Sequence, residues 1–479
     1  MGRSLTVAAG TAAASTLVSG GINKILGAND EIRVAVIGCR GKGAQHIRVF
    51  RDIPNVKVAA ICDPDEHVLA REKNKFTDDG ETVDTYKDMR YVMDRRDIQA
   101  VVIAAPNHWH ALAGIWACQA EKDAYVEKPI SHNIWEGRQL VKAARRYNRI
   151  LQTGTQNRSD VGMRAFLDYA KEEKLGQAEW AHGLWFKKRD SIGNVKGPQP
   201  IPEHIDYNLW TGPALLKPLR RENLHYDWHW FWETGNGDMA NLGVHQIDDC
   251  RFLTHTQGLP KHVISFGERW GYVDDGQTPN TQLALYKYDD IDIFIQIRNL
   301  PMKAGTNAMD HVRGVRAGNI VKFKDGYFAG GRGGGWFYDL HWNKVKQFPG
   351  DGGAGHQANF IDAVRKRDHS ILHAEIEQGH VSSALCHAAN ISYVLGQHND
   401  SLEPAAQAVE DVPQVAGIVD QWKEHLAANT VDLHRSPIRV GPWLQMNTKD
   451  EKFVGDWHCE ANMFVSETYR KPFVVPKNV

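Results

Sequence analysis

The sequence predicts an α/β fold with two domains, the first built on a parallel sheet and the second on a mostly antiparallel one. Two patterns predict it: apolar strands alternate with helical segments up to about residue 152, and strands of alternating polarity follow from residue 153. The length of 479 residues agrees, because it exceeds what a single core usually accommodates. We expect domains at 31–152 and 153–431, a leader at 1–30 and a tail at 432–479.

Continuous runs of Val, Ile and Ala mark the strands of the first domain. Such runs indicate strands that are buried on both faces of a doubly wound parallel sheet, with helices as the crossovers. We expect strands at 33–37, 56–61, 100–104, 124–126 and 150–153, and helices at 44–50, 111–120 and 135–147.

The second domain has a different pattern. Ile291, Ile293, Ile295 and Ile297 fall on one face of a strand, which is typical of antiparallel sheets with one buried side. We expect strands at 178–186, 262–272, 282–298 and 319–328, and helices at 163–174, 357–367 and 380–395. The Pro-, Trp- and His-rich stretch 187–234 is too long for a simple connection and is predicted to be a functional insertion. The tail lacks periodicity and is expected to wrap the body as an extended segment.

The leader contains a weakly apolar run of small residues, 5–17, after Arg3. This run resembles the central region of an export signal of the twin-arginine type, although only one arginine is present. We therefore expect an exported, periplasmic protein, with a disordered leader on a cytoplasmic protein as the alternative.

Composition excludes several classes of partner. A formal net charge of −1 removes the electrostatic argument for nucleic acid, and no apolar run is long enough for a membrane span. The cysteines are scattered without metal-ligand spacing, so we expect free thiols and assign no metal site; they are Cys39, Cys62, Cys118, Cys250, Cys386 and Cys459.

A glycine-rich loop between the first strand and the first helix predicts a dinucleotide site. Glycines at such a loop permit a tight turn and close approach of the backbone to a pyrophosphate. The predicted contacts are Gly38, Cys39, Arg40, Gly41 and Gly43. Asp63 ends the second strand, where a carboxylate binds ribose hydroxyls and repels a 2′-phosphate. NAD is thus favoured over NADP, although Arg40 could contact a phosphate; a glycine turn without a ligand is the alternative.

Polar residues also follow the third strand, at the sheet edge where ligands bind in open α/β folds. We expect Pro106, Asn107 and His110 to contact the cofactor; the alternative is that these residues only begin a helix.

The segment 235–249 carries a second set of polar residues. On one helix, Asn241, His245 and Asp248 or Asp249 would share a face, with Asp238 one turn earlier. A histidine between polar neighbours can act as a proton shuttle.

The aromatic run 228–232 suits the apolar face of a sugar ring, and we select Trp232 as a substrate contact, with core packing as the alternative. His225 and His229 have helical spacing for a metal but no evident third ligand.

Three motifs in order resemble the Gfo/Idh/MocA oxidoreductase family, named for glucose–fructose oxidoreductase and inositol dehydrogenase. They are the glycine loop, Glu127-Lys128-Pro129 after the fourth strand, and Asn241-x-Gly243-x-His245-x-x-Asp248, and the resemblance extends from about Arg33 to Gly396. Segments 207–214 and 374–396 resemble its exported bacterial branch. The family resemblance implies a Rossmann domain, then an α/β domain whose open, mostly antiparallel sheet often forms dimers; we expect a homo-oligomer, dimer or tetramer.

The resemblance further implies that Lys128 lies beside the nicotinamide and the substrate hydroxyl. A buried lysine there should have a lowered pKa, so it could take the hydroxyl proton. Many relatives have an aspartate where this chain has Asn241, which leaves open whether Lys128 or His245 is the base. The expected catalytic residues are Lys128, His245 and Asn241. Glu127, Lys128 and Gln156 complete the expected cofactor contacts, and Lys128, His245, Asn241 and Asp238 are the expected substrate contacts.

We therefore expect NAD-dependent oxidation or reduction of a secondary hydroxyl of a sugar or glycoside, with a dinucleotide that is retained tightly if the protein is exported. A redox-neutral NAD-dependent glycosidase or epimerase, acting through a transient keto-sugar, needs almost the same residues and is the alternative. A non-catalytic dinucleotide-sensing module is the third hypothesis.

Overall fold

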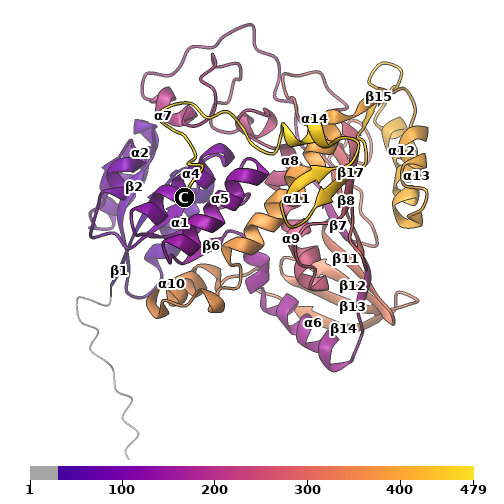
Figure 1. Ribbon diagram of the computed structural model, residues 1–479, viewed down its shortest axis with the longest axis horizontal. Coiled ribbons are helices and arrows are strands. Elements are labelled where there is room, and N and C mark those ends of the chain that lie inside the picture. Colours follow the sequence, from indigo (N-terminus) through magenta and orange to yellow (C-terminus); the bar gives the residue numbers. More distant parts are fainter. Residues whose placement is uncertain (1–30) are drawn as a thin grey trace, which may run out of the picture. The chain divides into compact units, whose positions relative to one another are not determined.

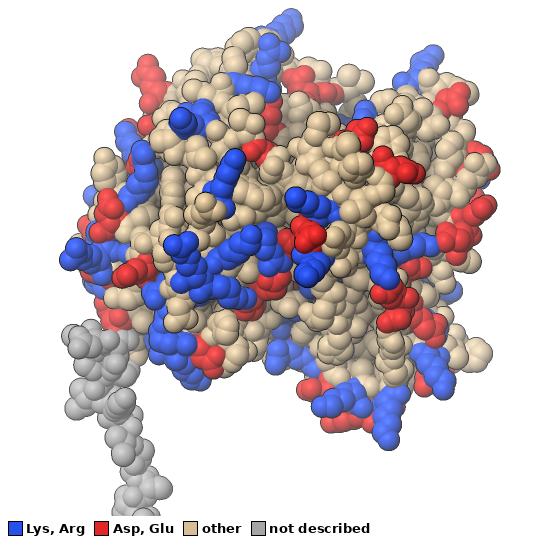
Figure 2. Space-filling model, in the orientation of Figure 1, with Lys and Arg blue, Asp and Glu red and all other residues tan. Residues whose placement is uncertain are grey.

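The computed structural model describes residues 31–479, so the predicted leader lies outside the described residues. Figure 1 shows the parallel sheet and its helices in the indigo and violet part of the chain, and the second sheet in the pink and orange part. No helix within residues 31–479 is both long and apolar enough to cross a membrane. Positive and negative side chains both spread over the face seen in Figure 2.

The first domain is a six-stranded parallel sheet in the order β3-β2-β1-β4-β5-β6, as the apolar runs predicted. Its strands are β1 (Ile32–Ile37), β2 (Val56–Cys62), β3 (Asp84–Tyr86), β4 (Ala100–Ile103), β5 (Asp123–Val126) and β6 (Leu151–Thr153). Its helices are α1 (Gly41–Arg51), α2 (Glu66–Asp78), α3 (Met89–Met93), α4 (Asn107–Gln119) and α5 (Ile134–Arg146). The strand order reverses between β1 and β4, and ligands bind at such a switch point, outside the carboxyl ends of the strands.

The second domain is a twelve-stranded sheet in which all paired neighbours run antiparallel except β7 and β10. Its main path is β14-β13-β12-β11-β7-β10-β9-β8-β16-β15. The strands are β7 (Ala178–Phe186), β8 (His262–Glu268), β9 (Thr281–Lys287), β10 (Asp292–Arg298), β11 (Ala317–Phe323), β12 (Gly326–Gly331), β13 (Gly334–Asp339), β14 (Lys344–Pro349), β15 (Gln397–Asn399), β16 (Ile438–Val440), β17 (Leu444–Asn447) and β18 (Lys452–Val454). The predicted α/β class with a mostly antiparallel second sheet is thus confirmed.

Helices cover both faces of this sheet (Figure 1). The α-helices are α6 (Val161–Glu172), α7 (Tyr207–Thr211), α8 (Gly237–Asn241), α9 (Gly243–Thr254), α10 (His356–Lys366), α11 (Ile376–Leu395), α12 (Glu403–Gln407), α13 (Pro413–Ala428) and α14 (His458–Asn462). Within residues 31–479, 3₁₀ turns lie at η2 (Gln156–Ser159), η3 (Asp227–Trp230) and η4 (His369–Ile371). Side chains of α9 and α11 pack against one face, and Val419 and Trp422 of α13 join Phe266 and Leu283 on the other.

Two segments of the second half return to the first domain. Phe360 and Ile361 of α10 pack in the same cluster as Val34 and Val36 of β1. The tail, which was predicted to wrap the body as an extended segment, forms in its first part the strands β16 and β17, and both pair with β8. Its last part runs back over the first domain, where Phe473 and Val475 are buried (Figure 1).

Candidate active site

One cavity of about 630 Å³ extends from the glycine loop to α9, and both domains line it. Twelve of the predicted site residues line this cavity: Gly38, Arg40, Gly41, Asp63, Pro106, Asn107, His110, Glu127, Lys128, Gln156, Asn241 and His245. Four others lie outside its lining: Cys39, Gly43, Trp232 and Asp238.

The glycine loop follows β1 and opens α1. Gly38 has a φ of +82°, a conformation that favours glycine, and a Cβ on Gly43 would lie 1.7 Å from the Gly38 carbonyl oxygen. Gly43 therefore permits the close packing of helix and strand that leaves the loop backbone free to approach a phosphate. The Cys39 thiol turns inward to the carbonyls of Val36 and Cys62, so its side chain does not face the cavity.

Asp63 follows β2 directly and is held by backbone donors. Its carboxylate accepts hydrogen bonds from the amides of Cys39 at 2.8 Å and Asp65 at 3.0 Å. Burial raises the pKa of Asp63 to about 6, so it is ionised at neutral pH. Its place on the cavity wall matches the role of a ribose-hydroxyl acceptor.

Glu127 lines the cavity next to Lys128 in the chain. His46 Nε2 lies 2.8 Å and Lys42 Nζ 3.7 Å from its carboxylate. Burial opposes ionisation, but these two partners together hold the pKa of Glu127 well below its usual range. The carboxylate also abuts Gly154, where a Cβ would lie 2.7 Å from it. Glu127 is thus a fixed negative charge beside Lys128.

The Lys128 ammonium reaches across to the second domain. Its Nζ donates to the backbone carbonyl of Asn241, and the Asn241 amide oxygen lies 3.5 Å away. Burial lowers the pKa of Lys128, while the charge of Glu127 opposes that shift. A buried lysine with a lowered pKa on the wall of this cavity can exchange a proton with a bound hydroxyl.

His245 lines the cavity from the first turns of α9. Burial, and then the charge of Lys128, lower the pKa of His245 to about 3, so its imidazole is neutral at physiological pH. Among residues 31–479, no group bonds its buried Nδ1. This neutral ring can therefore donate a hydrogen bond to a ligand or accept one from it, but it is poorly suited to take up a second proton.

The expectation of one helix face carrying Asn241, His245 and Asp248 or Asp249 is wrong. The helix breaks at Leu242, which has a φ of −125° and a ψ of −32°, so Asn241 ends α8 and His245 belongs to α9. The two aspartates face away from the cavity: Asp248 pairs with Arg158 at 2.7 Å, and Asp249 accepts a hydrogen bond from Asn157 at 2.8 Å.

Asp238 does not line the cavity, but it contacts a residue that does. Both of its carboxylate oxygens accept from Arg189 at 3.0 Å, and one also accepts from Asn241 Nδ2 at 3.0 Å. Arg189 belongs to the 187–234 insertion, which therefore connects through Asp238 and Asn241 to Lys128. Sequence reasoning missed Arg189, because nothing local marks an arginine whose partner lies 49 residues away.

The insertion also forms part of the cavity wall. Tyr226, Trp228 and His229 line it, with the His229 ring stacked 3.7 Å from that of Trp228. Nδ1 of His229 lies 2.6 Å from the Tyr226 carbonyl, whereas His225 Nε2 contacts Asp65 at 2.8 Å. The two histidines thus have separate partners. The aromatic run 228–232 therefore contributes Trp228 and His229 to the cavity wall, whereas the predicted Trp232 does not line it.

Comparison with known proteins identifies the family. Residues 32–155 match the model described as an oxidoreductase family with an NAD-binding Rossmann fold, and residues 179–276 match the C-terminal α/β domain of the same family. These two segments belong to the Gfo/Idh/MocA oxidoreductase family. The first domain is therefore an NAD-binding Rossmann domain, and the glycine cradle and Asp63 fit that cofactor.

The chain is also similar to curated bacterial proteins. A glycosyl hydrolase family 109 protein of Shewanella pealeana is 33% identical over 309 residues, 61% of this chain and 56% of the relative. One of Shewanella woodyi is 32% identical over 301 residues, 61% and 54% respectively. This chain thus spans about half the length of the curated relatives it matches.

Two solved structures share the fold. A levoglucosan dehydrogenase in complex with NADH has a TM-score of 0.57 and 15% identity, over 75% of this chain and 97% of that one. The WlbA dehydrogenase of Bordetella pertussis, in complex with NADH and UDP-GlcNAcA, has a TM-score of 0.55 and 16% identity, over 75% and 95%.

Proposed function

We propose that this protein oxidises or reduces a secondary hydroxyl of a sugar or glycoside with NAD. One observation carries the proposal: the glycine loop and Asp63 line the same cavity as Lys128, Asn241 and His245. A cofactor held at the loop could therefore meet a substrate held at Lys128 without leaving the cavity. The family assignment and the sugar-acting neighbours support this reaction class.

The residues divide into those that hold the cofactor and those that act on the hydroxyl. Gly38, Gly41 and Arg40 would hold the pyrophosphate, and Asp63 the ribose hydroxyls. Bound NAD supplies the acceptor for the hydride that leaves the carbinol carbon. As the carbonyl forms, the hydroxyl proton must leave the oxygen and be accepted by the protein.

Lys128 is the residue we assign to that proton. Its lowered pKa brings the amine closer to neutrality, whereas His245, with a pKa of about 3, is a weak base. His245 would then accept or donate a hydrogen bond to orient the substrate. Glu127 stabilises the protonated lysine after transfer, because its carboxylate stays ionised next to it.

Substitution of Lys128 tests this assignment. Lys128→Met should lower turnover of an active glycoside by about 100-fold or more, because general acid–base groups contribute 10²–10⁴-fold. NAD affinity, measured by fluorescence quenching, should change less than about threefold. Lys188→Met, at an exposed lysine outside the cavity lining, is the matched control. Unchanged turnover in Lys128→Met, or loss of NAD binding, would contradict the role.

A redox-neutral reaction is the second candidate, favoured by the relatives named glycosyl hydrolase family 109. The same residues would oxidise the sugar, permit loss or inversion of a group beside the ketone, and return the hydride. Product release without net NADH absorbance at 340 nm, with solvent deuterium entering beside the transient ketone, would establish this reaction. Net NADH formation would exclude it.

Export of the protein and its assembly into a dimer or tetramer stay predictions. The first is tested by cell fractionation of the full chain, and the second by light scattering of the purified protein.

A further inference from the structure

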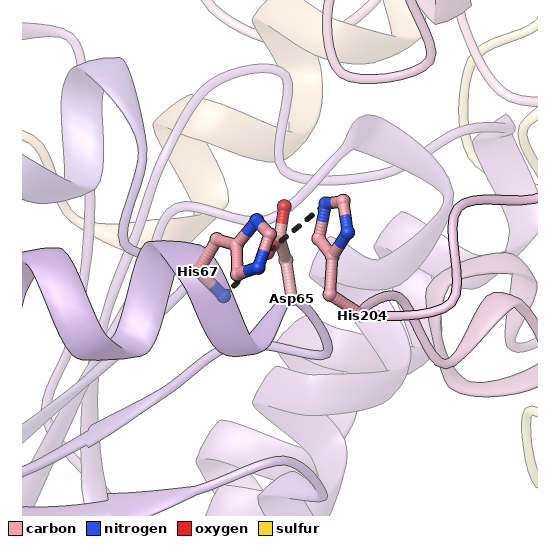
Figure 3. Close-up of side chains that lie close together, drawn as sticks. All are labelled: Asp65, His67 and His204. Carbon is pink, nitrogen blue, oxygen red and sulfur yellow. Dashed lines mark hydrogen bonds and ion pairs between the residues drawn. The ribbon is translucent and has the colours of Figure 1, made fainter.

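Three potential metal ligands meet where the insertion contacts the first domain. Asp65 caps α2, His67 lies in the first turn of α2, and His204 belongs to the insertion. One ligand atom of each lies within 4.8 Å of those of the other two. Figure 3 shows the two imidazoles next to the Asp65 carboxylate. Sequence analysis did not find this group, because 137 residues separate its two histidines.

The backbone holds these residues in register. The Glu66 amide donates to the His204 carbonyl at 2.9 Å, and the Asp206 amide donates to the Pro64 carbonyl at 2.9 Å. Asp65 and Ile205 form an antiparallel bridge between these bonds. The proximity of His204 to Asp65 is therefore set by main-chain pairing, and does not depend on the orientation of an exposed side chain.

Both histidine rings keep their nitrogens available. Within residues 31–479, neither ring makes a hydrogen bond; the rings stack with centroids 3.8 Å apart, and His204 Nε2 lies 3.8 Å from Asp65 Oδ1. Asp65 is 3% exposed, so its carboxylate is buried, whereas His67 is exposed and His204 half-buried. A buried carboxylate flanked by two unbonded imidazoles is a ligand set suited to a divalent transition metal.

We propose that Asp65, His67 and His204 bind one zinc ion, which joins the insertion to the cofactor domain. Imidazole nitrogen and carboxylate oxygen are ordinary zinc ligands, and a site with three protein ligands leaves a fourth position for water. Bonds of about 2.0 Å place tetrahedral ligand atoms about 3.3 Å apart. The two rings must turn out of their parallel stack to reach this geometry, and their exposure leaves room for that rotation.

A fourth residue connects the site to the cavity. His225 Nε2 lies 2.8 Å from Asp65 Oδ2, and His225 also lines the cavity wall near Asp63. A hydrogen bond from His225 would orient the Asp65 carboxylate for the metal, as hydrogen bonds to ligating carboxylates do in other metal sites. Bound zinc would thus stabilise the position of the insertion next to the end of the cavity that contains Asp63. It takes no part in the proposed chemistry at Lys128.

Zinc binding to the full chain tests the proposal without any assay of activity. The protein is treated with a chelator, dialysed, and titrated with Zn²⁺ by calorimetry, with metal content measured by mass spectrometry. We expect one ion per chain for the wild type. His67→Ala and His204→Ala should each weaken binding by about 100-fold, and His225→Ala by about tenfold. His369→Ala, at an exposed histidine outside the cluster, is the matched control.

A second readout covers the stability of the insertion. Zn²⁺ should slow tryptic cleavage within residues 187–234 in the wild type and in His369→Ala, but not in His204→Ala. Equal affinity for Zn²⁺ in the wild type and the double variant His67→Ala/His204→Ala would overturn the site. Binding that is lost in His67→Ala but kept in His204→Ala would overturn the link to the insertion.

Discussion

Asp63 is the residue to which we assign the preference for NAD over NADP. Its ionised carboxylate repels a 2′-phosphate, and burial raises its pKa to about 6. Above pH 6 the charge is present; as pH falls through 6 it is neutralised and the repulsion is lost. We expect the ratio of NADP to NAD dissociation constants to fall roughly tenfold between pH 8 and pH 5, about 1.4 kcal/mol. Binding titrations at the two pH values measure this ratio.

Asp63→Asn provides the control for that titration. The variant should show the low ratio at both pH values, because it carries no charge to lose. A ratio that changes with pH equally in both proteins would assign the effect to another group.

At the residue scale, the sequence predicted cavity-lining residues correctly where they belong to a recognisable motif. Gly38, Asp63, Lys128 and His245 all follow strand ends or known motif spacing, and all line the cavity. It was less informative for Asp238, whose partner Arg189 comes from the insertion. A side chain's partner across the fold leaves no local pattern in the sequence.

At the element scale, the break between α8 and α9 changes the role of Asp248. This buried carboxylate accepts from Arg158 Nε at 2.7 Å and Nη2 at 3.0 Å, and from the Ser382 hydroxyl at 2.7 Å. The pair connects η2 to α9, and so holds the helix that carries His245. Asp248 therefore positions the site without contacting it.

Arg158→Met should destabilise the protein by about 3 kcal/mol, because it leaves a buried carboxylate without its main partner. Urea denaturation followed by circular dichroism measures the free energy of unfolding. Arg145→Met removes a more exposed pair with Glu375 and should cost less than about 1 kcal/mol. Equal losses in the two variants would show that the Arg158–Asp248 pair has no special role.

Element boundaries were predicted less well than element types. The segments 282–298 and 319–328 each proved to be two strands, β9 with β10 and β11 with β12. The turns lie at Asp289-Asp290 and at Lys324-Asp325, polar pairs that interrupt the alternating pattern. Reading these pairs as hairpin turns would have divided both segments.

At the scale of the whole molecule, the tail ties the second half of the chain to the first domain. Phe473 is 1% exposed; it packs edge-on against Trp109 at a centroid distance of 5.4 Å and lies tilted against Trp116 at 6.4 Å. Arg470 donates to the Asn208 side chain at 2.6 Å, which fastens the tail to the insertion. The tail thus covers α4, whose first residues line the cavity.

Phe473→Ala should lower the free energy of unfolding by about 3 kcal/mol through lost burial and a residual cavity. Thermal denaturation and urea titration measure the loss. Phe464→Ala, at a tail phenylalanine that is 42% exposed, should cost about 0.5 kcal/mol or less. A tail that does not stabilise the first domain would give similar values for both.

The two-domain α/β architecture was predictable, because strand periodicity differs clearly between the two halves. The contacts that segments of the second half make with distant parts of the chain were not predictable. Neither the packing of α10 on the first sheet nor the pairing of β16 with β8 has a sequence signal, since both depend on contacts between distant segments.

We propose that a hydride passes between a sugar carbon and NAD in this cavity. The most direct test incubates the full chain and NAD with glycosides deuterated at each carbinol carbon in turn, then analyses the nucleotide by mass spectrometry. We predict that one labelled position transfers deuterium to the nicotinamide, and that Lys128→Met abolishes the transfer. Product formation with no deuterium on the nucleotide from any position would contradict the account.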